Sequence, residues 1–164
     1  MGEEVCGRCV GDLTSLDRFA PIDSVERSLL GDLVSSLDPR DPVCVPATAD
    51  LGRAMNAMTA EGVGAVLVTD ANGLLVGILT ERDFLTKIAG SEQLALLPVH
   101  QFMTANPETV RLSDPLSFAV WQMDVGGYRH LPVVDEGKPV GMISVRDVLR
   151  HVLDICQTSG RKIG

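Results

Sequence analysis

The sequence contains one pattern twice, and this repeat constrains the fold more than any other feature. Residues 42–85 match residues 107–149 at a displacement of 65, which becomes 64 after one residue is lost in a turn. The identities run through both copies in the same order, include Asp83 matching Asp147, and end with Leu85 matching Leu149. A repeat of this length indicates two equivalent structural units that pack on each other.

Within each copy the pattern predicts the element order β-α-β-β-α. Apolar residues at helical spacing predict helices over 51–58 and 116–123. Thr48 and Ser113 are their expected N-caps, and Gly62 and Gly127 are expected to end them. The ranges expected to form strands are 43–45, 65–68, 75–79, 108–110, 130–134 and 140–143. A unit of about 45 residues is too small to be stable alone, so we expect the copies to pack sheet to sheet. The expected fold class is α/β, of the α+β type.

The most specific motifs lie where the last strand of each copy ends. Residues 77–83 (GILTERD) and 141–147 (GMISVRD) resemble the signature of CBS domains, the cystathionine-β-synthase-type repeat. Residues 128–135 (YRHLPVVD) resemble the second-copy hairpin of the same family. The resemblance implies a tandem pair, or Bateman module, with pseudo-twofold symmetry. The sequence departs from the family in residues 12–40, which add an N-terminal segment with an expected helix. The boundaries we expect are 1–30 for the extension, 31–90 and 91–155 for the repeats, and 156–164 for a tail.

The same motifs place chemistry at a helix N-terminus. Thr80 and Ser144 stand where a strand should give way to a helix, whose free N–H groups can hold a phosphate. Three residues later, Asp83 and Asp147 offer carboxylates suited to the two hydroxyls of a ribose. The combination suggests a nucleoside phosphate. The alternative is that Ser/Thr-x-x-Asp serves only to cap the helices.

The resemblance also implies which residues share a site. The small Gly64 and Ala65 would let a flat ring approach the strand, and their counterparts in the second copy are the basic Arg129 and His130. Carried over from the family, the better-equipped site combines Val43, Gly64, Ala65, Ile78, Thr80 and Asp83 with Arg129 and His130 as the phosphate clamp. The mirror site, around Thr109, Ser144 and Asp147, lacks such a clamp. Alternatively, His130 is an ordinary strand histidine, and Arg129 pairs with Asp124.

Charge and hydropathy exclude several partner classes. The net charge of −8 and the pI near 4.7 argue against nucleic acid and anionic membranes as partners. No apolar run approaches the roughly 18 residues of a membrane span, and the N-terminus does not resemble a signal peptide. We therefore expect a cytoplasmic protein.

The cysteines and the N-terminal segment lie partly outside the repeat. Cys6 and Cys9 form a CxxC pair that is half of a zinc site, a redox pair, or incidental to a tail, and we expect no metal. Cys44 and Cys156 are expected in the core. Asp23 and Glu26 are spaced as a capping box, ahead of a helical apolar face formed by Val25, Leu29, Leu30, Leu33, Val34 and Leu37. That helix should pack on the module or on a second chain.

Together these features predict a non-catalytic regulatory module that senses an adenosine-containing metabolite, namely AMP, ADP, ATP or S-adenosylmethionine. We expect no obligatory cofactor and no enzymatic activity, because no nucleophile–base pair accompanies the scattered histidines. A homodimer and a regulated partner protein, which the sequence does not identify, are also expected. The alternative is an interaction or dimerisation module with vestigial sites. Its expected contact face carries Met55, Met58, Trp121 and Met123.

Overall fold

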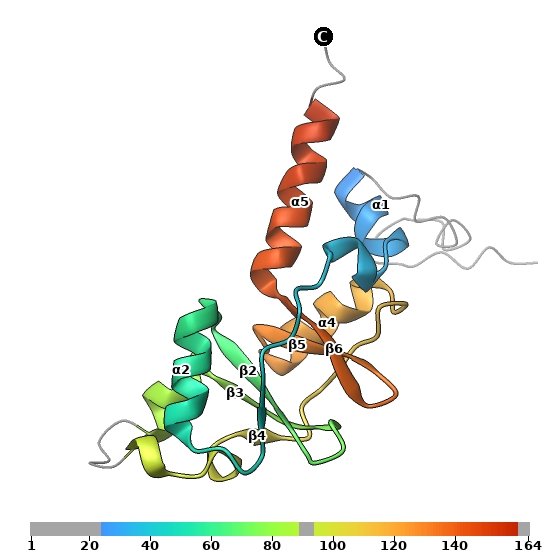
Figure 1. Cartoon of the computed structure of the whole chain (residues 1–164). Coiled ribbons are helices and arrows are strands. Elements are labelled where there is room, and N and C mark those ends of the chain that lie inside the picture. Colours follow the sequence, from blue (N-terminus) through green and yellow to red (C-terminus); the bar gives the residue numbers. More distant parts are fainter. Residues whose placement is uncertain (1–23, 89–93, 161–164) are drawn as a thin grey trace, which may run out of the picture.

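The protein is described by a computed structural model that covers residues 24–88 and 94–160. Two α/β units lie side by side, and the last helix projects away from both toward the C-terminus (Figure 1). In chain order the elements are α1 (Ser24–Gly31), η2 (Val34–Leu37), β1 (Cys44–Pro46), α2 (Leu51–Glu61), β2 (Ala65–Thr69), β3 (Leu75–Thr80), α3 (Glu81–Asp83), η3 (Phe84–Ile88), η4 (Leu94–Leu96), η5 (Val99–Gln101), β4 (Thr104–Ala105), α4 (Leu116–Gly126), β5 (His130–Asp135), β6 (Lys138–Ser144) and α5 (Val145–Gly160). None of the helices in these two described ranges is long and apolar enough to cross a membrane.

Helices α2 and α4 occupy the ranges expected from their apolar spacing. Both end at a glycine in the left-handed region, Gly62 at φ 61° and Gly127 at φ 64°. This conformation is easily reached only without a Cβ, which explains why both repeats carry glycine there. The two helix ends are therefore confirmed.

The expected N-caps of these helices are wrong. The N-cap of α2 is Asp50, whose side chain accepts a 2.8 Å hydrogen bond from the backbone N–H of Arg53, while Thr48 lies in the preceding turn. Helix α4 follows Pro115, which provides no side-chain cap, so Ser113 also lies two residues too early. Both helices begin two residues later than a search for hydroxyl caps suggests.

The strands form two sheets of unequal size. In the first, the order is β1-β2-β3-β4, with β1 parallel to β2 and the other pairs antiparallel. The second contains only the antiparallel pair β5-β6. The strand expected over 108–110 is reduced to one parallel bridge between Val110 and Val133. The short strand β4 just ahead of it pairs instead with β3 of the first repeat.

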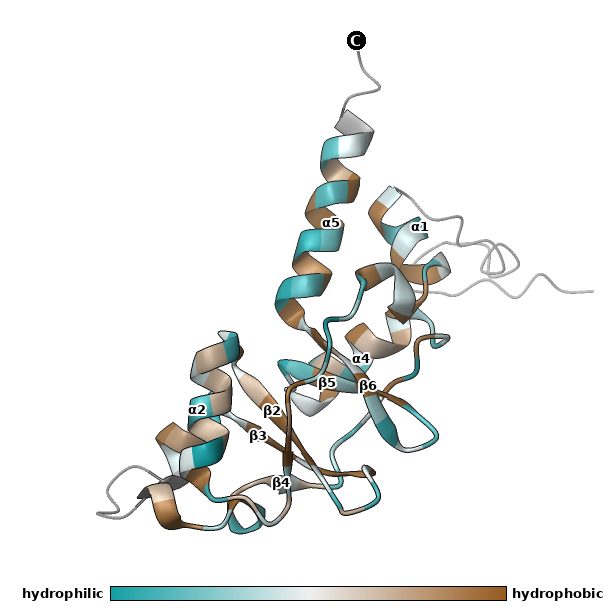
Figure 2. Ribbon diagram, viewed as in Figure 1, coloured by the Kyte–Doolittle hydropathy of each residue, from teal (hydrophilic) through white to brown (hydrophobic). Residues whose placement is uncertain are grey.

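The core has one hydrophobic cluster in each repeat and a third between them. The first surrounds α2 and the second surrounds α4, β5 and β6. In the third, Ala65, Leu67 and Ile78 of the first sheet pack against Met142 of β6. The ribbon is accordingly hydrophobic along β2 and β3, whereas hydrophobic and hydrophilic residues alternate along α5 (Figure 2). The expected contact between the sheets is confirmed.

Two cysteines and two methionines differ from their expected environments. Cys44 and Cys156 are both exposed free thiols and not core residues. In β1 the side chains alternate, so the burial of Val45 turns Cys44 toward solvent. Met58 and Met123 are buried in the two repeat cores, and this removes them from the expected contact face. Met55 and Trp121 remain exposed.

The segment that precedes each repeat is bonded to the other repeat. Residues 32–34, before the first copy, bond to the start of α4, and residues 97–99, before the second copy, bond to the start of α2. The bonds are Leu116 N to Asp32 O (2.8 Å), Val34 N to Asp114 O (2.9 Å), Leu51 N to Leu97 O (2.8 Å) and Val99 N to Ala49 O (2.9 Å). This exchange extends the pseudo-twofold symmetry upstream of the sequence repeat and ties the two copies together.

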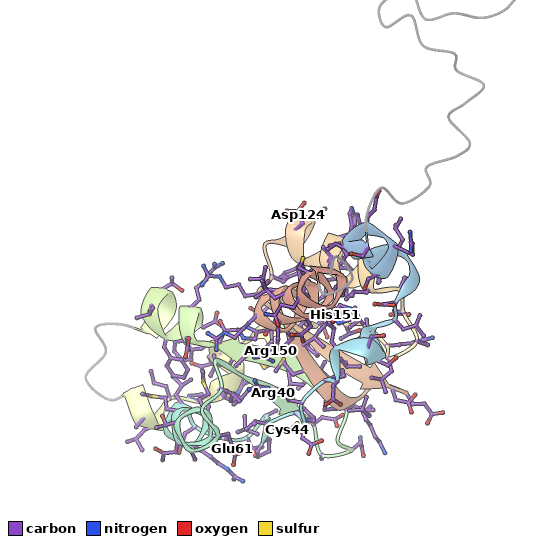
Figure 3. The ribbon with its side chains drawn as sticks, turned by 90° about the horizontal axis from the view of Figure 1, so that it is seen from above. Arg40, Cys44, Glu61, Asp124, Arg150 and His151 are labelled. Atoms are coloured by element: carbon purple, nitrogen blue, oxygen red, sulfur yellow. The ribbon has the colours of Figure 1, made fainter. Side chains whose placement is uncertain are left out.

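The N-terminal helix is shorter than its apolar face suggested. α1 ends at Gly31, and the rest of the expected helix forms the separate 3-10 turn η2. Position 23 of the expected capping box lies outside the described residues. Asp32 Oδ2 accepts a hydrogen bond from Ser28 and lies 2.9 Å from His151 Nε2. This pair joins the end of α1 to α5, where His151 is labelled in Figure 3.

Tight packing of the first lead-in segment against β6 should make Gly141 intolerant of a side chain. A Cβ there would lie 2.9 Å from the Cβ of Pro39, closer than real contacts allow. We expect Gly141→Ala to lower the free energy of unfolding by about 1–3 kcal/mol. Gly31→Ala is the matched control, because nothing lies within 4 Å of its added Cβ. Chemical denaturation of both variants is the measurement, and equal stabilities would contradict the described packing.

The Asp32 contact predicts an acid-sensitive contribution to stability. Two side-chain hydrogen bonds lower the pKa of Asp32 below its usual 3.8. The bond with Ser28 has the larger effect, and the bond with His151 has the smaller one. A lowered carboxyl pKa stabilises the fold above the unfolded value, and this contribution is lost as pH falls through the folded pKa. We expect the stability difference between wild type and Asp32→Asn to be constant near neutral pH and to shrink below about pH 4. A difference that does not change with pH in urea denaturation would refute this role of the carboxylate.

Candidate functional site

The first candidate site forms where β3 ends and α3 begins. The backbone N–H and the hydroxyl of Thr80 both donate to Asp83 Oδ2, at 2.8 and 2.7 Å. Asp83 is only 7% exposed and is the one buried charged side chain among the described residues. Its oxygen closes the first turn in the manner of a capping box, so the capping interpretation is realised in this structure.

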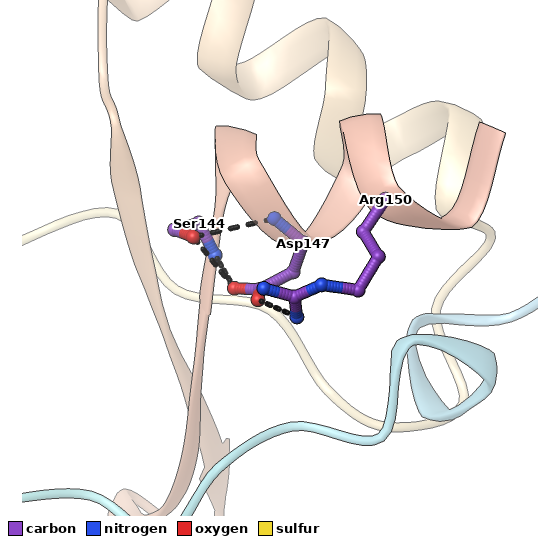
Figure 4. Close-up of polar contacts among 3 residues, drawn as sticks. All are labelled: Ser144, Asp147 and Arg150. Atoms are coloured by element: carbon purple, nitrogen blue, oxygen red, sulfur yellow. Dashed lines mark hydrogen bonds and ion pairs between the residues drawn. The ribbon is translucent and has the colours of Figure 1, made fainter. Parts of the chain in front are cut away.

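The second site repeats this geometry with an added cation. The N–H and hydroxyl of Ser144 donate to Asp147 Oδ2 at 2.8 and 2.6 Å (Figure 4). Arg150, one turn further along α5, places Nη1 3.3 Å from the other oxygen, Oδ1. At the position equivalent to Arg150 the first repeat has Thr86, whose hydroxyl donates to a backbone carbonyl. The residue one helical turn after the carboxylate therefore differs between the two repeats.

Residues of the two repeats meet beside Gly64. A Cβ added to Gly64 would lie 3.5 Å from Cε1 of His130 and 3.4 Å from the carboxylate of Glu81. The backbone repeats itself here, because Glu81 N donates to Gly64 O and Val145 N donates to Arg129 O, both at 3.0 Å. The start of β2, the end of β3 and the start of β5 thus converge on one spot. Glycine leaves room beside the imidazole that a side chain would fill.

His130 is half-buried between the two carboxylate turns. Burial lowers the pKa of His130 below its usual 6.5, Glu81 and Asp147 oppose that shift, and Arg129 and Arg146 add to it. The folded protein therefore disfavours the charged imidazole. The contribution of neutral His130 to the stability of the fold is therefore complete above about pH 6.5. It is lost as the pH drops through the pKa that His130 has in the folded protein.

The other expected site residues lie close to this point to differing degrees. Ala65 pairs with Thr80 across β2 and β3, and both Ala65 and Ile78 are buried in the cluster between the repeats. Val43 is half-buried, and its carbonyl accepts a 2.8 Å bond from Leu67. Arg129 is exposed. The described contacts thus bring together Gly64, Ala65, Ile78, Thr80, Asp83 and His130.

The mirror residues are less closely connected. Ser144 faces His130 in the β5-β6 ladder, and Asp147 follows in the first turn of α5. Thr109 is half-buried next to the single bridge at Val110, and no described contact links it to Asp147. The second site is therefore assembled from β5, β6 and α5 alone.

Sequence reasoning missed two charged residues of these sites. Glu81 follows Thr80 directly and lies against Gly64 and His130, where it adds negative charge. Arg150 binds Asp147 at a spacing of three residues. That i, i+3 pair was detectable in the sequence, but the position of Glu81 depends on how the two repeats meet.

The described ranges contain no grouping of three or more His, Cys, Asp or Glu side chains that could hold a metal ion. Cys6 and Cys9, the candidate zinc or redox pair, lie outside those ranges. The described contacts beside Gly64 involve carboxylate, hydroxyl, imidazole and backbone groups.

The comparisons with known proteins agree with the repeat. The family model described as "CBS domain" matches residues 32–90 and 99–154. A CBS domain-containing protein of Arabidopsis thaliana is 41% identical over 120 residues, which are 72% of this chain and 22% of the relative. The chain thus spans about a fifth of the length of that relative.

Solved structures show the same fold. A CBS-domain containing protein from Agrobacterium tumefaciens has a TM-score of 0.66 and 34% identity, with 73% of this chain and 98% of the other covered. A CBS domain protein from Pyrobaculum aerophilum, solved in complex with AMP, has a TM-score of 0.66 and 28% identity, with coverage of 73% and 98%. Two matched repeats, a confirmed fold and the two turn motifs place this chain in the CBS domain family, as a tandem pair.

Proposed function

We propose that this protein is a non-catalytic sensor of an adenosine-containing metabolite, which it binds in a cleft shared by its two repeats. Thr80 and Asp83 would hold the ribose and the phosphate-proximal end, while Val43, Gly64, Ala65 and Ile78 would line the base. Arg129 and His130 would hold the phosphate. A ligand that touches both repeats can shift their relative arrangement by its differential affinity for two states.

The observation that carries this proposal is the contact of Gly64 with His130. It brings the start of β2 and the carboxylate of Glu81 beside the imidazole of His130 in the other repeat, so a nucleoside phosphate bound there would contact both repeats. The AMP bound to the Pyrobaculum relative adds support from a protein 28% identical to this one.

The two sites should not be equivalent. Around Ser144, Thr109 and Asp147, the basic pair is replaced by Gly64 and Ala65, and Arg150 already engages the carboxylate. A ribose at this mirror site would have to compete with that ion pair. We therefore propose one occupied cleft per chain and a weaker or empty second cleft.

A second candidate function has its own observation. Both carboxylates close capping boxes without any ligand, so the motifs could serve helix stability in a module whose role is protein–protein association. We propose a homodimer in either case. Ligand binding separates the two functions, because a vestigial site would bind no nucleotide.

The aspartates provide a matched pair of variants. Asp83→Ala and Asp147→Ala each remove a capping carboxylate from an equivalent turn, so both should lose about 0.5–2 kcal/mol of stability. Only Asp83→Ala should weaken AMP binding, by about tenfold or more, because it removes charged hydrogen bonds to the ribose. Calorimetric titration of both folded variants is the measurement. Equal affinities in wild type and Asp83→Ala would refute the assignment.

The lowered pKa of His130 predicts proton uptake on binding. A phosphate beside the imidazole favours its charged form and so raises a pKa that burial has lowered. Near pH 6, binding of AMP to wild type should therefore take up more protons than binding to His130→Gln. Calorimetric titration of both proteins with AMP in buffers of different ionisation enthalpy measures the number of protons taken up. Because both proteins bind the same ligand, the ionisation of the AMP phosphate contributes equally and drops out of the difference. Identical uptake by both proteins would remove His130 from the phosphate site.

A further inference from the structure

Glu81 occupies a position at which the backbones of the two repeats agree and their side chains differ. Its N–H donates to Gly64 O at 3.0 Å, and Val145 of the second repeat makes the equivalent bond to Arg129 O. The turn therefore forms equally well with a carboxylate or with an apolar side chain at this position. The charge of Glu81 is not needed to build the turn, so we ask what else it does.

The carboxylate of Glu81 reaches the point where the other repeat begins its hairpin. Its Cδ and Oε2 would each lie 3.4 Å from a Cβ added to Gly64, and Cε1 of His130 would lie 3.5 Å from the same Cβ. The carboxylate and the imidazole are therefore at most about 7 Å apart, a separation at which charges near a protein surface still interact appreciably. An anion bound at His130 would also be close to Glu81.

The charged side chains around His130 have a net negative influence on it. Among them Glu81 has the largest effect on the pKa of His130 and Asp147 the next largest, and both raise it. Arg129 and Arg146 lower the same pKa by smaller amounts. The two carboxylates thus outweigh the two guanidinium groups at the imidazole, although Arg129 adjoins it in the chain.

The surface next to Glu81 provides no compensating cation. Glu81 also lines an open groove of about 620 Å³ between α2 and the residues that follow β3. None of the described residues that line this groove is cationic, and its walls include Met55, Met58 and Phe84. The hydroxyl of Thr59, another lining residue, already donates to a backbone carbonyl. A phosphate that entered the groove would lose water without gaining a charged partner.

We propose that Glu81 is a specificity-determining residue, which makes the cleft select adenosine ligands with a single phosphate over those with two or three. This rests on the proposed function and specifies the ligand class of the same cleft. One phosphate at His130 is balanced by the proton that the imidazole takes up. Each further phosphate adds negative charge close to Glu81, so affinity falls in the order AMP, ADP, ATP.

Substitutions that change the charge of residue 81 in steps test this selection. The ratio of the ATP to the AMP dissociation constant is measured by calorimetry in wild type, Glu81→Gln and Glu81→Lys, at low salt and without divalent cations. We expect Glu81→Gln to lower this ratio about fivefold and Glu81→Lys to lower it further. Both effects should shrink at 1 M salt, where the screening length is about 3 Å.

Glu136→Gln is the matched control for net charge. Glu136 is exposed in the turn between β5 and β6, six residues beyond His130 along the hairpin. At about 3.3 Å per residue this places it about 20 Å away, beyond the screening length of about 10 Å at 0.1 M salt. This variant should therefore keep the wild-type ratio. A ratio lowered equally by Glu136→Gln and Glu81→Gln would overturn a local role for Glu81.

The remaining outcomes separate this inference from the function on which it rests. ATP binding to wild type as tightly as AMP would overturn the inference, and so would a ratio that Glu81→Gln leaves unchanged while AMP still binds. Repeating the titrations with Mg²⁺ tests the opposite role of the carboxylate. Stronger ATP binding with Mg²⁺ that Glu81→Gln abolishes would make Glu81 a metal ligand and overturn the inference. Absence of AMP, ADP and ATP binding to wild type would overturn the proposed function together with this inference.

Discussion

The exchange of lead-in segments is the constraint on which the rest of the structure depends. Each repeat is too small to be stable alone, and the backbone groups at the start of its main helix are satisfied by the segment that precedes the other repeat. The chain therefore cannot form one repeat without placing the other. This interlocking fixes how β2 of the first repeat meets β5 of the second, and so it fixes the contact of Gly64 with His130.

Divergence within this symmetric frame produces the functional asymmetry. The backbone bonds of the two turns are the same, but one helical turn further on the first repeat has Thr86 and the second has Arg150, which contacts Asp147. The outer helices differ in the same way, since aromatic residues on α4 replace polar and small ones on α2. In our account, the difference between the two turns selects one cleft for the ligand.

Sequence alone predicted what depends on the repeat and on local periodicity, including the helices, the glycines that end them and the two carboxylate turns. It failed where tertiary context decides. The caps at Thr48 and Ser113 were wrong because the N-cap positions lie two residues later, at Asp50 and Pro115. The expectation that Cys44 lies in the core was wrong, because side chains alternate along β1 and that of Cys44 points toward solvent. The exchange of lead-in segments and the position of Glu81 arise between distant parts of the chain, so no local pattern could show them.

The most direct test of this account is calorimetric titration of the purified, ligand-stripped protein with AMP, ADP, ATP and S-adenosylmethionine. We expect at least one of them to bind with a stoichiometry of one per chain, in the single cleft proposed for Thr80, Asp83, Arg129 and His130. Absence of binding by all four would contradict the sensor function and leave the turns as helix caps. Two equal sites per chain would contradict the asymmetry on which the assignment of Arg129 and His130 rests.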